Sequence, residues 1–240
     1  MEWNNLDTLG SFQRLLALKG KVDVAQAMAG QDGARRVAVY QTPMACGLRY
    51  SYAAEAVDDD VLSALTELAD EAQLTAKYRA LLDGEIINTG ENRRVLHHLT
   101  RGQQGNSVVC DGVDKRSFYV QQQEKAADFA RRVSRGEIVN EAGQKFTTVV
   151  QIGIGGSDLG PRAMYLALEN WAKSNGCFSM EARFISNVDP DDAAGVLRGI
   201  DLERALFVLV SKSGTTLETL TNETFVKNAL RAKRLNPAKH

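Results

Sequence analysis

Apolar residues recur at helical spacing through most of the first 143 residues. In one long stretch, Val61, Leu65 and Leu68 follow one another at intervals of four and three residues, which predicts a single helix over Asp60–Leu82. Similar spacing predicts further helices at Ser11–Lys19, Asp23–Ala29 and Phe118–Val133. The region 1–143 is therefore predicted to be mostly helical.

Two shorter signals interrupt this helical region. β-prone runs at Arg36–Tyr40 and Leu48–Ser51 flank turn-forming residues, which predicts a small hairpin. Further along, Thr89 and a nearby acidic residue predict a cap that opens a helix over Arg93–Leu99. Residues 101–108 show no period and are expected to form an exposed loop.

From residue 144 the pattern changes to strand, turn and helix in alternation. Strands are predicted at Thr147–Ile152, Ala182–Ile185 and Ala205–Val210, and helices at Pro161–Ser174, Asp191–Gly199 and Leu217–Arg234. The strands are continuous apolar runs, which predicts burial on both faces, and the helices between them predict parallel pairing. Residues 144–240 are thus predicted to form an α/β domain, a parallel sheet flanked by helices of the flavodoxin-like kind.

The last residues of the sequence bear on this sheet. Asn236-Pro237-Ala238-Lys239-His240 follows a helix at the point where the next parallel strand should begin. A sheet of three parallel strands would leave an unpaired edge. The sheet is therefore expected to be incomplete.

Composition and charge limit the classes of partner. The chain has 240 residues, of which 44% are hydrophobic and 25% are charged, as in globular proteins. Its 29 basic and 30 acidic residues give a formal net charge of −1, so neither nucleic acid nor an acidic membrane is expected to bind it. The amino terminus has no signal-peptide pattern, and no stretch approaches the roughly 20 apolar residues of a membrane span.

The cysteines predict a reducing compartment. Cys46, Cys110 and Cys177 are odd in number and far apart, without a C-x-x-C pair, so we expect free, largely buried thiols and a cytoplasmic protein.

The acidic cluster at Asp189–Asp192 is better explained by a turn and a helix start than by a metal site. We therefore expect no metal.

A glycine-rich turn follows the first strand of the α/β region. It reads Gly153-Ile154-Gly155-Gly156-Ser157-Asp158 and leads into a helix. Glycines allow a ligand to approach the backbone closely, and the amides at a helix start attract anions. Asp158 stands where a dinucleotide fingerprint requires its third glycine, and Ser186-Asn187 stands where an acidic residue is needed, so a nicotinamide cofactor is not expected. Taken alone, this turn is more often structural than ligand-binding.

The loop after the third strand strengthens the case for an anion site. Ser211, Lys212, Ser213, Gly214, Thr215 and Thr216 provide four hydroxyls, one ammonium group and one glycine before a helix. Hydroxyls and main-chain amides donate to phosphate oxygens, and the helix start favours their charge. The alternative is an ordinary helix cap by Thr215 or Thr216, with Glu218 or Glu223 as partner.

The histidines are weaker candidates. His97 and His98 have no acidic residue nearby in the sequence, which favours structural or surface roles, and His240 stands at the last position.

At these loops the sequence resembles the phosphoglucose isomerase family, the glucose-6-phosphate isomerases. The similarity lies in the run Val149-Val150-Gln151-Ile152-Gly153-Ile154-Gly155-Gly156-Ser157-Asp158-Leu159-Gly160-Pro161, in residues 87–97 and in residues 236–240. The resemblance implies a sugar-isomerase fold, of which a full enzyme carries two copies. It also implies that the chain corresponds to the amino-terminal part of such an enzyme.

The resemblance also implies the site. The substrate phosphate would be held by Ser211–Thr216, with Gly156 and Ser157 beside the sugar. The family often has threonine and phenylalanine where this chain has Ser213 and Gly214. Glu218 matches a position near the active site and is expected to support catalysis rather than to act as the base.

The family's reaction needs no cofactor or metal. It moves a proton between C1 and C2 of the sugar through an enediolate, and its catalytic glutamate, histidine and lysine would lie beyond His240. We therefore expect no catalytic residue in this chain, and a homodimer for the full-length protein. The alternative is a non-catalytic phosphosugar-binding module of the same fold.

Overall fold

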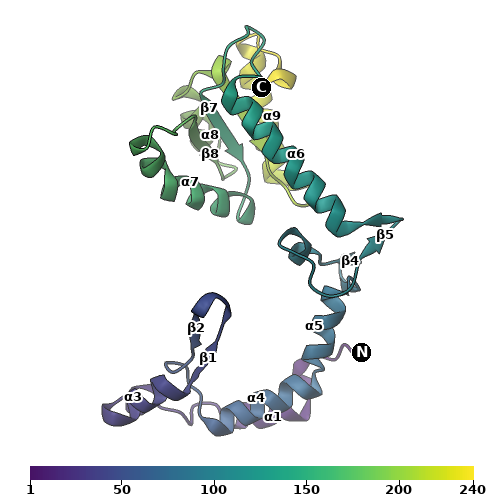
Figure 1. Cartoon of the computed structure of the whole chain (residues 1–240), viewed down its shortest axis with the longest axis vertical. Coiled ribbons are helices and arrows are strands. Elements are labelled where there is room, and N and C mark those ends of the chain that lie inside the picture. The colour runs from purple at the N-terminus through teal and green to yellow at the C-terminus, as the bar shows by residue number, and fades with distance from the viewer. The chain divides into compact units, whose positions relative to one another are not determined.

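The computed structural model describes all 240 residues, which form two compact units (Figure 1). The first unit comprises Met1–Val120 and the second comprises Gln121–His240, so the border falls within the long helix α6 (Lys115–Arg135). The change from helical to α/β pattern that we predicted near residue 144 lies inside the second unit and stays a prediction about domain organisation.

The first unit contains short helices and three two-stranded antiparallel sheets. Its α-helices are α1 (Gly10–Ala17), α2 (Val24–Ala27), α3 (Gly30–Val39), α4 (Asp59–Glu71) and α5 (Leu74–Leu82). Its strands are β1 (Gln41–Pro43), β2 (Arg49–Ser51), β3 (Ile86–Asn88), β4 (Arg93–Arg94), β5 (Val109–Cys110) and β6 (Val113–Asp114). Short 3-10 helices lie at Leu6–Thr8, Ala45–Gly47 and His97–Thr100. A hairpin is present in the predicted region as β1 and β2, which pair through Gln41 to Ser51 and Pro43 to Arg49, but its first strand is formed by residues 41–43 and not by Arg36–Tyr40.

Three expectations for the first unit are wrong. Residues Arg36–Tyr40 are not a strand, because most of them belong to α3. There the buried Arg36 donates from Nε to the carbonyl of Ala53 at 2.6 Å and from its terminal nitrogen to Glu55 and Val57 at 2.8 and 2.5 Å. These contacts bind the helix to the segment after the hairpin and override the local β propensity.

The second and third differences arise at left-handed residues. The helix expected over Asp60–Leu82 is divided into α4 and α5, because Gln73 between them has a φ of 55°. Instead of a helix over Arg93–Leu99, β3 and β4 form a hairpin followed by a 3-10 helix. Its turn is held by the side chain of Asn88, which accepts from the amide of Glu91 at 3.1 Å, and by Asn92 with a φ of 52°.

The second unit contains the predicted parallel sheet. Strands β7 (Thr148–Ile152), β8 (Glu181–Ile185) and β9 (Ala205–Leu209) are arranged in the order β8-β7-β9, with β7 parallel to both neighbours. Its helices are α7 (Gly156–Ser174), α8 (Pro190–Arg198) and α9 (Leu217–Ala232), with short 3-10 helices at Leu202–Arg204 and Pro237–Lys239. The fold class predicted from the sequence is confirmed.

One face of the sheet carries the core. Val150 and Ile152 of β7 and Ile185 of β8 pack with Leu197 of α8 and Leu230 of α9, and all five are buried. Neighbouring residues in a strand face opposite sides, and Phe184 packs edge-on against Tyr165 of α7 with ring centroids 6.0 Å apart. Helices α8 and α9 therefore cover one face of the sheet, and α7 covers the other.

Burial departs from two expectations. Strand β9 is not buried along its whole length, because Val208 and Leu209 near its end are 38% and 41% exposed. The cysteines are free, as expected, but they are not buried: Cys46 and Cys177 are exposed and Cys110 is half-buried. Cys46 lies in the connection between β1 and β2, in a left-handed conformation with a φ of 57°.

Removing side-chain volume from this core tests its role. Replacing Ile185 by alanine should lower the free energy of unfolding by about 2 to 5 kcal/mol, because the cavity would open at a fully buried position. Urea denaturation followed by circular dichroism measures the change. The matched variant Val188→Ala, at a position that is 47% exposed, should change the stability by less than about 0.5 kcal/mol. Equal effects of the two substitutions would contradict the assignment of the core.

Candidate functional site

The three strands of the second unit end at the same level. Ile152 of β7 pairs in register with Ile185 of β8 and with Leu209 of β9. Three loops, 153–155, 186–189 and 210–216, therefore leave the sheet from one edge, where ligands of open α/β sheets bind. The backbone continues this pairing, because Gly153 donates to the carbonyl of Ile185 at 3.2 Å and Val210 donates to that of Ile152 at 2.9 Å.

The glycine-rich turn depends on two of its glycines. A Cβ atom at Gly153 would lie 2.5 Å from the carbonyl oxygen of Ser157, so only glycine allows the chain to approach itself this closely. Gly155 has a φ of 56° and a ψ of −119°, a conformation that L side chains rarely adopt. Helix α7 begins directly afterwards, at Gly156, five residues earlier than the sequence predicted.

The early start of α7 places Pro161 inside the helix and leaves one backbone carbonyl without its usual hydrogen-bond donor. Proline has no amide hydrogen, so it cannot donate to the carbonyl of Ser157 four residues earlier. The side chain of Gln151, from β7, replaces this donor, with its Nε2 atom 2.8 Å from that oxygen. The predicted site residues Gly156 and Ser157 are thus held against the strand by a side chain that the sequence did not single out.

The second loop is organised by its own hydroxyls. Ser211 Oγ accepts from the amide of Gly214 at 3.1 Å and shares a hydrogen bond with Thr216 Oγ1 at 3.0 Å. Ser213 Oγ accepts from the amide and from the hydroxyl of Thr215, at 3.2 and 3.0 Å. Gly214 has a φ of 71° and makes the turn possible. All four predicted hydroxyls therefore belong to one compact loop.

The loop leaves the first turn of α9 without a side-chain cap. Thr216 occupies the N-cap position, but its hydroxyl bonds Ser211 and makes no cap hydrogen bond. Glu223, a possible capping partner, instead forms an ion pair, with its Oε1 atom 2.5 Å from Lys227 Nζ. The simple capping role is therefore wrong for Thr216, and the positive end of the helix dipole remains available to an anion. Lys212 and Glu218 are exposed at this edge.

Several polar residues of the same edge were not predicted to belong to the site. The buried carboxylate of Asp158 pairs with Arg162 at 3.0 Å, and Arg162 also donates to Ser186 Oγ at 2.8 Å. The spacing of Asp158 and Arg162, four residues apart at a helix start, could have indicated this pair. In α9, buried Asn222 donates to the carbonyl of Asn187 at 2.8 Å.

Thr219 is the remaining buried polar residue in this part of α9. It is 1% exposed, and its hydroxyl has no hydrogen-bond partner in the protein. No sequence signal distinguished it from the neighbouring threonines.

The other candidates have structural roles. His98 Nε2 is 3.1 Å from the carbonyl of Leu82 in the first unit, a structural contact. His240 is buried, with Nδ1 3.2 Å from the carbonyl of Ala205, and its own carbonyl accepts from Phe207 at 2.7 Å. The acidic cluster lies at a helix start, as predicted, and Asp189 caps α8 by accepting from the amide of Asp191 at 2.9 Å. The chain contains no group of three or more His, Cys, Asp or Glu side chains that could hold a metal ion.

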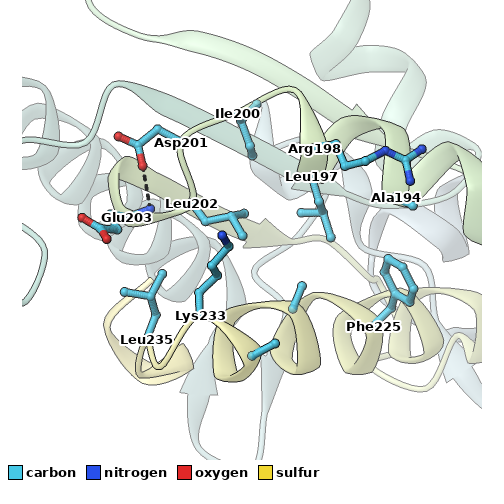
Figure 2. A pocket seen from close by; sticks show the side chains of 12 residues that line it. Ala194, Leu197, Arg198, Ile200, Asp201, Leu202, Glu203, Phe225, Lys233 and Leu235 are labelled. Atoms are coloured by element: carbon cyan, nitrogen blue, oxygen red, sulfur yellow. Dashed lines mark hydrogen bonds between the residues drawn. The ribbon is translucent and has the colours of Figure 1, made fainter.

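A groove of about 680 Å³ lies at the opposite edge of the sheet (Figure 2). It is lined by the end of α8, the end of α9 and the segment that precedes β9, and Figure 2 shows Leu197, Ile200, Phe225 and Leu235 around it. None of the predicted site residues lines this groove. It is therefore separate from the two loops.

None of the helices has the length and continuous apolar character that crossing a membrane requires.

Comparison with known proteins identifies the family of the chain. The family model described as Phosphoglucose isomerase matches residues 51–240, which include both loops. The chain belongs to the phosphoglucose isomerase family. The resemblance noted in the sequence is thereby confirmed.

Similar proteins support this membership. Glucose-6-phosphate isomerases of Treponema pallidum (strain Nichols) and Treponema denticola are 52% and 53% identical to the chain, over 99% and 98% of its length. A crystal structure of a glucose-6-phosphate isomerase from Chlamydia trachomatis aligns with a TM-score of 0.75 and 33% identity, over 99% of the chain. The chain spans 45% of the length of each Treponema relative and 44% of the Chlamydia protein.

The close approach at Gly153 is directly testable. Replacing Gly153 by alanine should destabilise the chain by about 1 to 3 kcal/mol, because the Cβ atom would force the first turn of α7 away from the strand. Urea denaturation gives the change. The matched variant Gly160→Ala, in the same helix with open space around the new atom, should raise the stability by up to about 1 kcal/mol. A neutral result at Gly153 would mean that the turn adapts and does not depend on this contact.

Proposed function

We propose that this chain is the sugar-phosphate-binding part of a glucose-6-phosphate isomerase. The observation that carries the proposal is the loop Ser211–Thr216, in which four hydroxyls surround the uncapped start of α9 in a member of the phosphoglucose isomerase family. Its ligand would be glucose 6-phosphate or fructose 6-phosphate.

Each part of the edge has a role in this proposal. The phosphate would accept hydrogen bonds from the first amides of α9 and from Ser211, Ser213, Thr215 and Thr216, with the charge of Lys212 adding to the attraction. Rotation of the hydroxyls is sufficient to exchange their bonds within the loop for bonds to a phosphate oxygen. The sugar would lie beside Gly156 and Ser157, where the glycines leave the backbone accessible.

The proposed reaction is an aldose-ketose isomerisation that moves a proton between C1 and C2 through an enediolate. It requires a carboxylate with access to the proton and donors for the developing oxyanion. Asp158 does not fit the role of base, since it is buried and paired with Arg162. Glu218 is exposed in the first turn of α9, and we assign it a supporting role.

We further propose that the catalytic base and its partners lie outside these 240 residues. The chain covers 45% of the length of its Treponema relatives, which leaves room for such residues in those proteins. A non-catalytic phosphosugar-binding module is the second candidate, and it is favoured by the lack of a carboxylate in the loops 153–155 and 210–216, beside which only Glu218 is exposed in the first turn of α9. The two proposals share the binding site and differ in turnover by the longer protein.

The assembly and location follow from the family and remain proposals. We propose a homodimer for the full-length protein and a cytoplasmic location, with no cofactor. The free cysteines, two of them exposed, suit a reducing compartment.

Binding is tested by an amide NMR titration. Glucose 6-phosphate and inorganic phosphate should shift the signals of Gly214 and of the first turn of α9, whereas glucose should not. Replacing Ser211, Ser213 and Thr216 together by alanine should abolish these shifts, because the hydroxyl donors are removed. The control variant Thr221→Ala/Thr224→Ala removes hydroxyls that bond only carbonyls of their own helix, at 2.9 Å, and should titrate like the parent. Shifts that persist in the triple variant, or that gather at Asp189–Asp192, would place the anion elsewhere.

Catalysis is tested separately. The 240-residue chain, purified from a host that lacks its own isomerase, should not interconvert glucose 6-phosphate and fructose 6-phosphate above background. A coupled assay with a dehydrogenase measures the rate. Turnover that is lost on Glu218→Gln substitution would instead make Glu218 the base and overturn the proposal that this residue only supports the reaction.

A further inference from the structure

One ion pair in α7 connects two of the three loops. Arg162 reaches the same oxygen of Asp158 with Nε and with a terminal nitrogen, both at 3.0 Å. The terminal nitrogen also lies 2.8 Å from Ser186 Oγ, just after β8. The guanidinium carbon is 4.8 Å from the ring centre of Phe184. Arg162 therefore joins the first turn of α7 to the end of the neighbouring strand.

The burial of this pair distinguishes it from an ordinary surface contact. The Asp158 side chain is 5% exposed, and that of Arg162 is 34% exposed. A second pair with the same spacing in the same helix, Glu169 with Lys173, has side chains that are 23% and 50% exposed. Removing one partner of a buried pair leaves an uncompensated charge, whereas an exposed charge is stabilised by water.

The turn that precedes Asp158 is held by backbone hydrogen bonds and by two side-chain contacts. Within the backbone, Ser157 donates to the carbonyl of Ile154 at 3.1 Å and Leu159 donates to that of Gly155 at 2.9 Å. Cβ atoms at Gly155 and Gly156 would have no neighbour within 4 Å, so no other segment packs closely against these two positions. The side-chain contacts are those of Gln151 with the Ser157 carbonyl and of Arg162 with Asp158. The amide of Asp158 also donates to the carbonyl of Gly155 at 3.0 Å, so a displacement of Asp158 would move the turn itself.

We infer that Arg162 is a positioning residue for the sugar. It holds Asp158, and through it the Gly155–Ser157 turn, against β8, so that the backbone beside the sugar keeps a fixed place relative to the phosphate loop. It also neutralises a carboxylate that would otherwise repel the phosphate. This inference rests on the proposed function, because it assigns the turn to the sugar half of a phosphosugar ligand.

The inference predicts that substitution of Arg162 lowers the affinity for one ligand and not for another. Inorganic phosphate needs only the loop Ser211–Thr216, but glucose 6-phosphate also needs the turn. In the 240-residue chain, Arg162→Ala should weaken glucose 6-phosphate binding about tenfold and inorganic phosphate binding by less than about twofold, since a misplaced contact affects only the ligand that uses it. Amide NMR titrations give both dissociation constants.

Two further variants complete the experiment. Ser186→Ala removes the hydrogen bond between Arg162 and the residue after β8, leaves Asp158 paired and the Phe184 contact in place, and should weaken glucose 6-phosphate binding by about threefold. It serves as the test if Arg162→Ala fails to fold. Lys173→Ala breaks the exposed pair of the same helix and should leave both affinities unchanged. Hydrogen exchange of the Asp158 and Leu159 amides without ligand should become faster in Arg162→Ala and stay unchanged in Lys173→Ala.

The outcomes separate the two proposals. If the parent chain binds neither ligand, the proposed function fails and the positioning role fails with it. If the parent binds both and Arg162→Ala, or Ser186→Ala in its place, behaves like Lys173→Ala, only the positioning role is overturned. An equal loss of affinity for both ligands would likewise overturn it, because the substitution would then act on the whole edge.

Discussion

The parallel hydrogen bonding of β7 with both of its neighbours is the constraint on which the candidate site depends. It aligns Ile152, Ile185 and Leu209, and so the loops after the three strands leave from one edge. Each loop leads into a helix, and the starts of α7, α8 and α9 consequently gather there. Three helix dipoles direct their positive ends to this edge. A chain with a net charge of −1 can therefore attract an anion locally without a cluster of cations.

Around this edge, several hydrogen bonds join a side chain to a partner that regular secondary structure would not give it. A strand residue, Gln151, serves a helix carbonyl, and a helix residue, Asn222, serves the carbonyl of Asn187 in a loop. Thr216, placed where a cap is expected, bonds a loop hydroxyl instead. The Asn222 contact joins segments 35 residues apart, whereas the partners of Gln151 and Thr216 lie six and five residues away. Gln151 and Asn222 thus hold backbone of this edge without themselves needing to contact a ligand. The hydroxyl of Thr216 bonds Ser211, so the amides at the start of α9 have no side-chain cap.

The sheet and both loops were predictable because their signals are local. Continuous apolar runs located the three strands to within a residue, and glycine or hydroxyl composition marked the loops that follow two of them. The errors have tertiary causes. Arg36 is helical because it binds carbonyls 17 to 21 residues away, a contact that no local propensity contains. The role of Arg162 likewise depends on Ser186, 24 residues later, although its partner Asp158 lies at a spacing that the sequence displays. The full burial expected for β9 rested on its apolar run alone, whereas β9 is an edge strand paired with β7 and its end is partly exposed.

Pro161 and Gln151 have a consequence for how sequences of this fold can diverge. The proline removes the donor that the Ser157 carbonyl would normally receive, and the glutamine amide supplies it from the adjacent strand. A change at either position alters what the other must provide. A residue other than proline at position 161 would restore the helical hydrogen bond to the Ser157 carbonyl, and position 151 could then be apolar. An apolar residue at position 151 beside a retained proline would leave that carbonyl without a donor. The two positions should therefore covary among homologues, although ten residues and a change from strand to helix separate them.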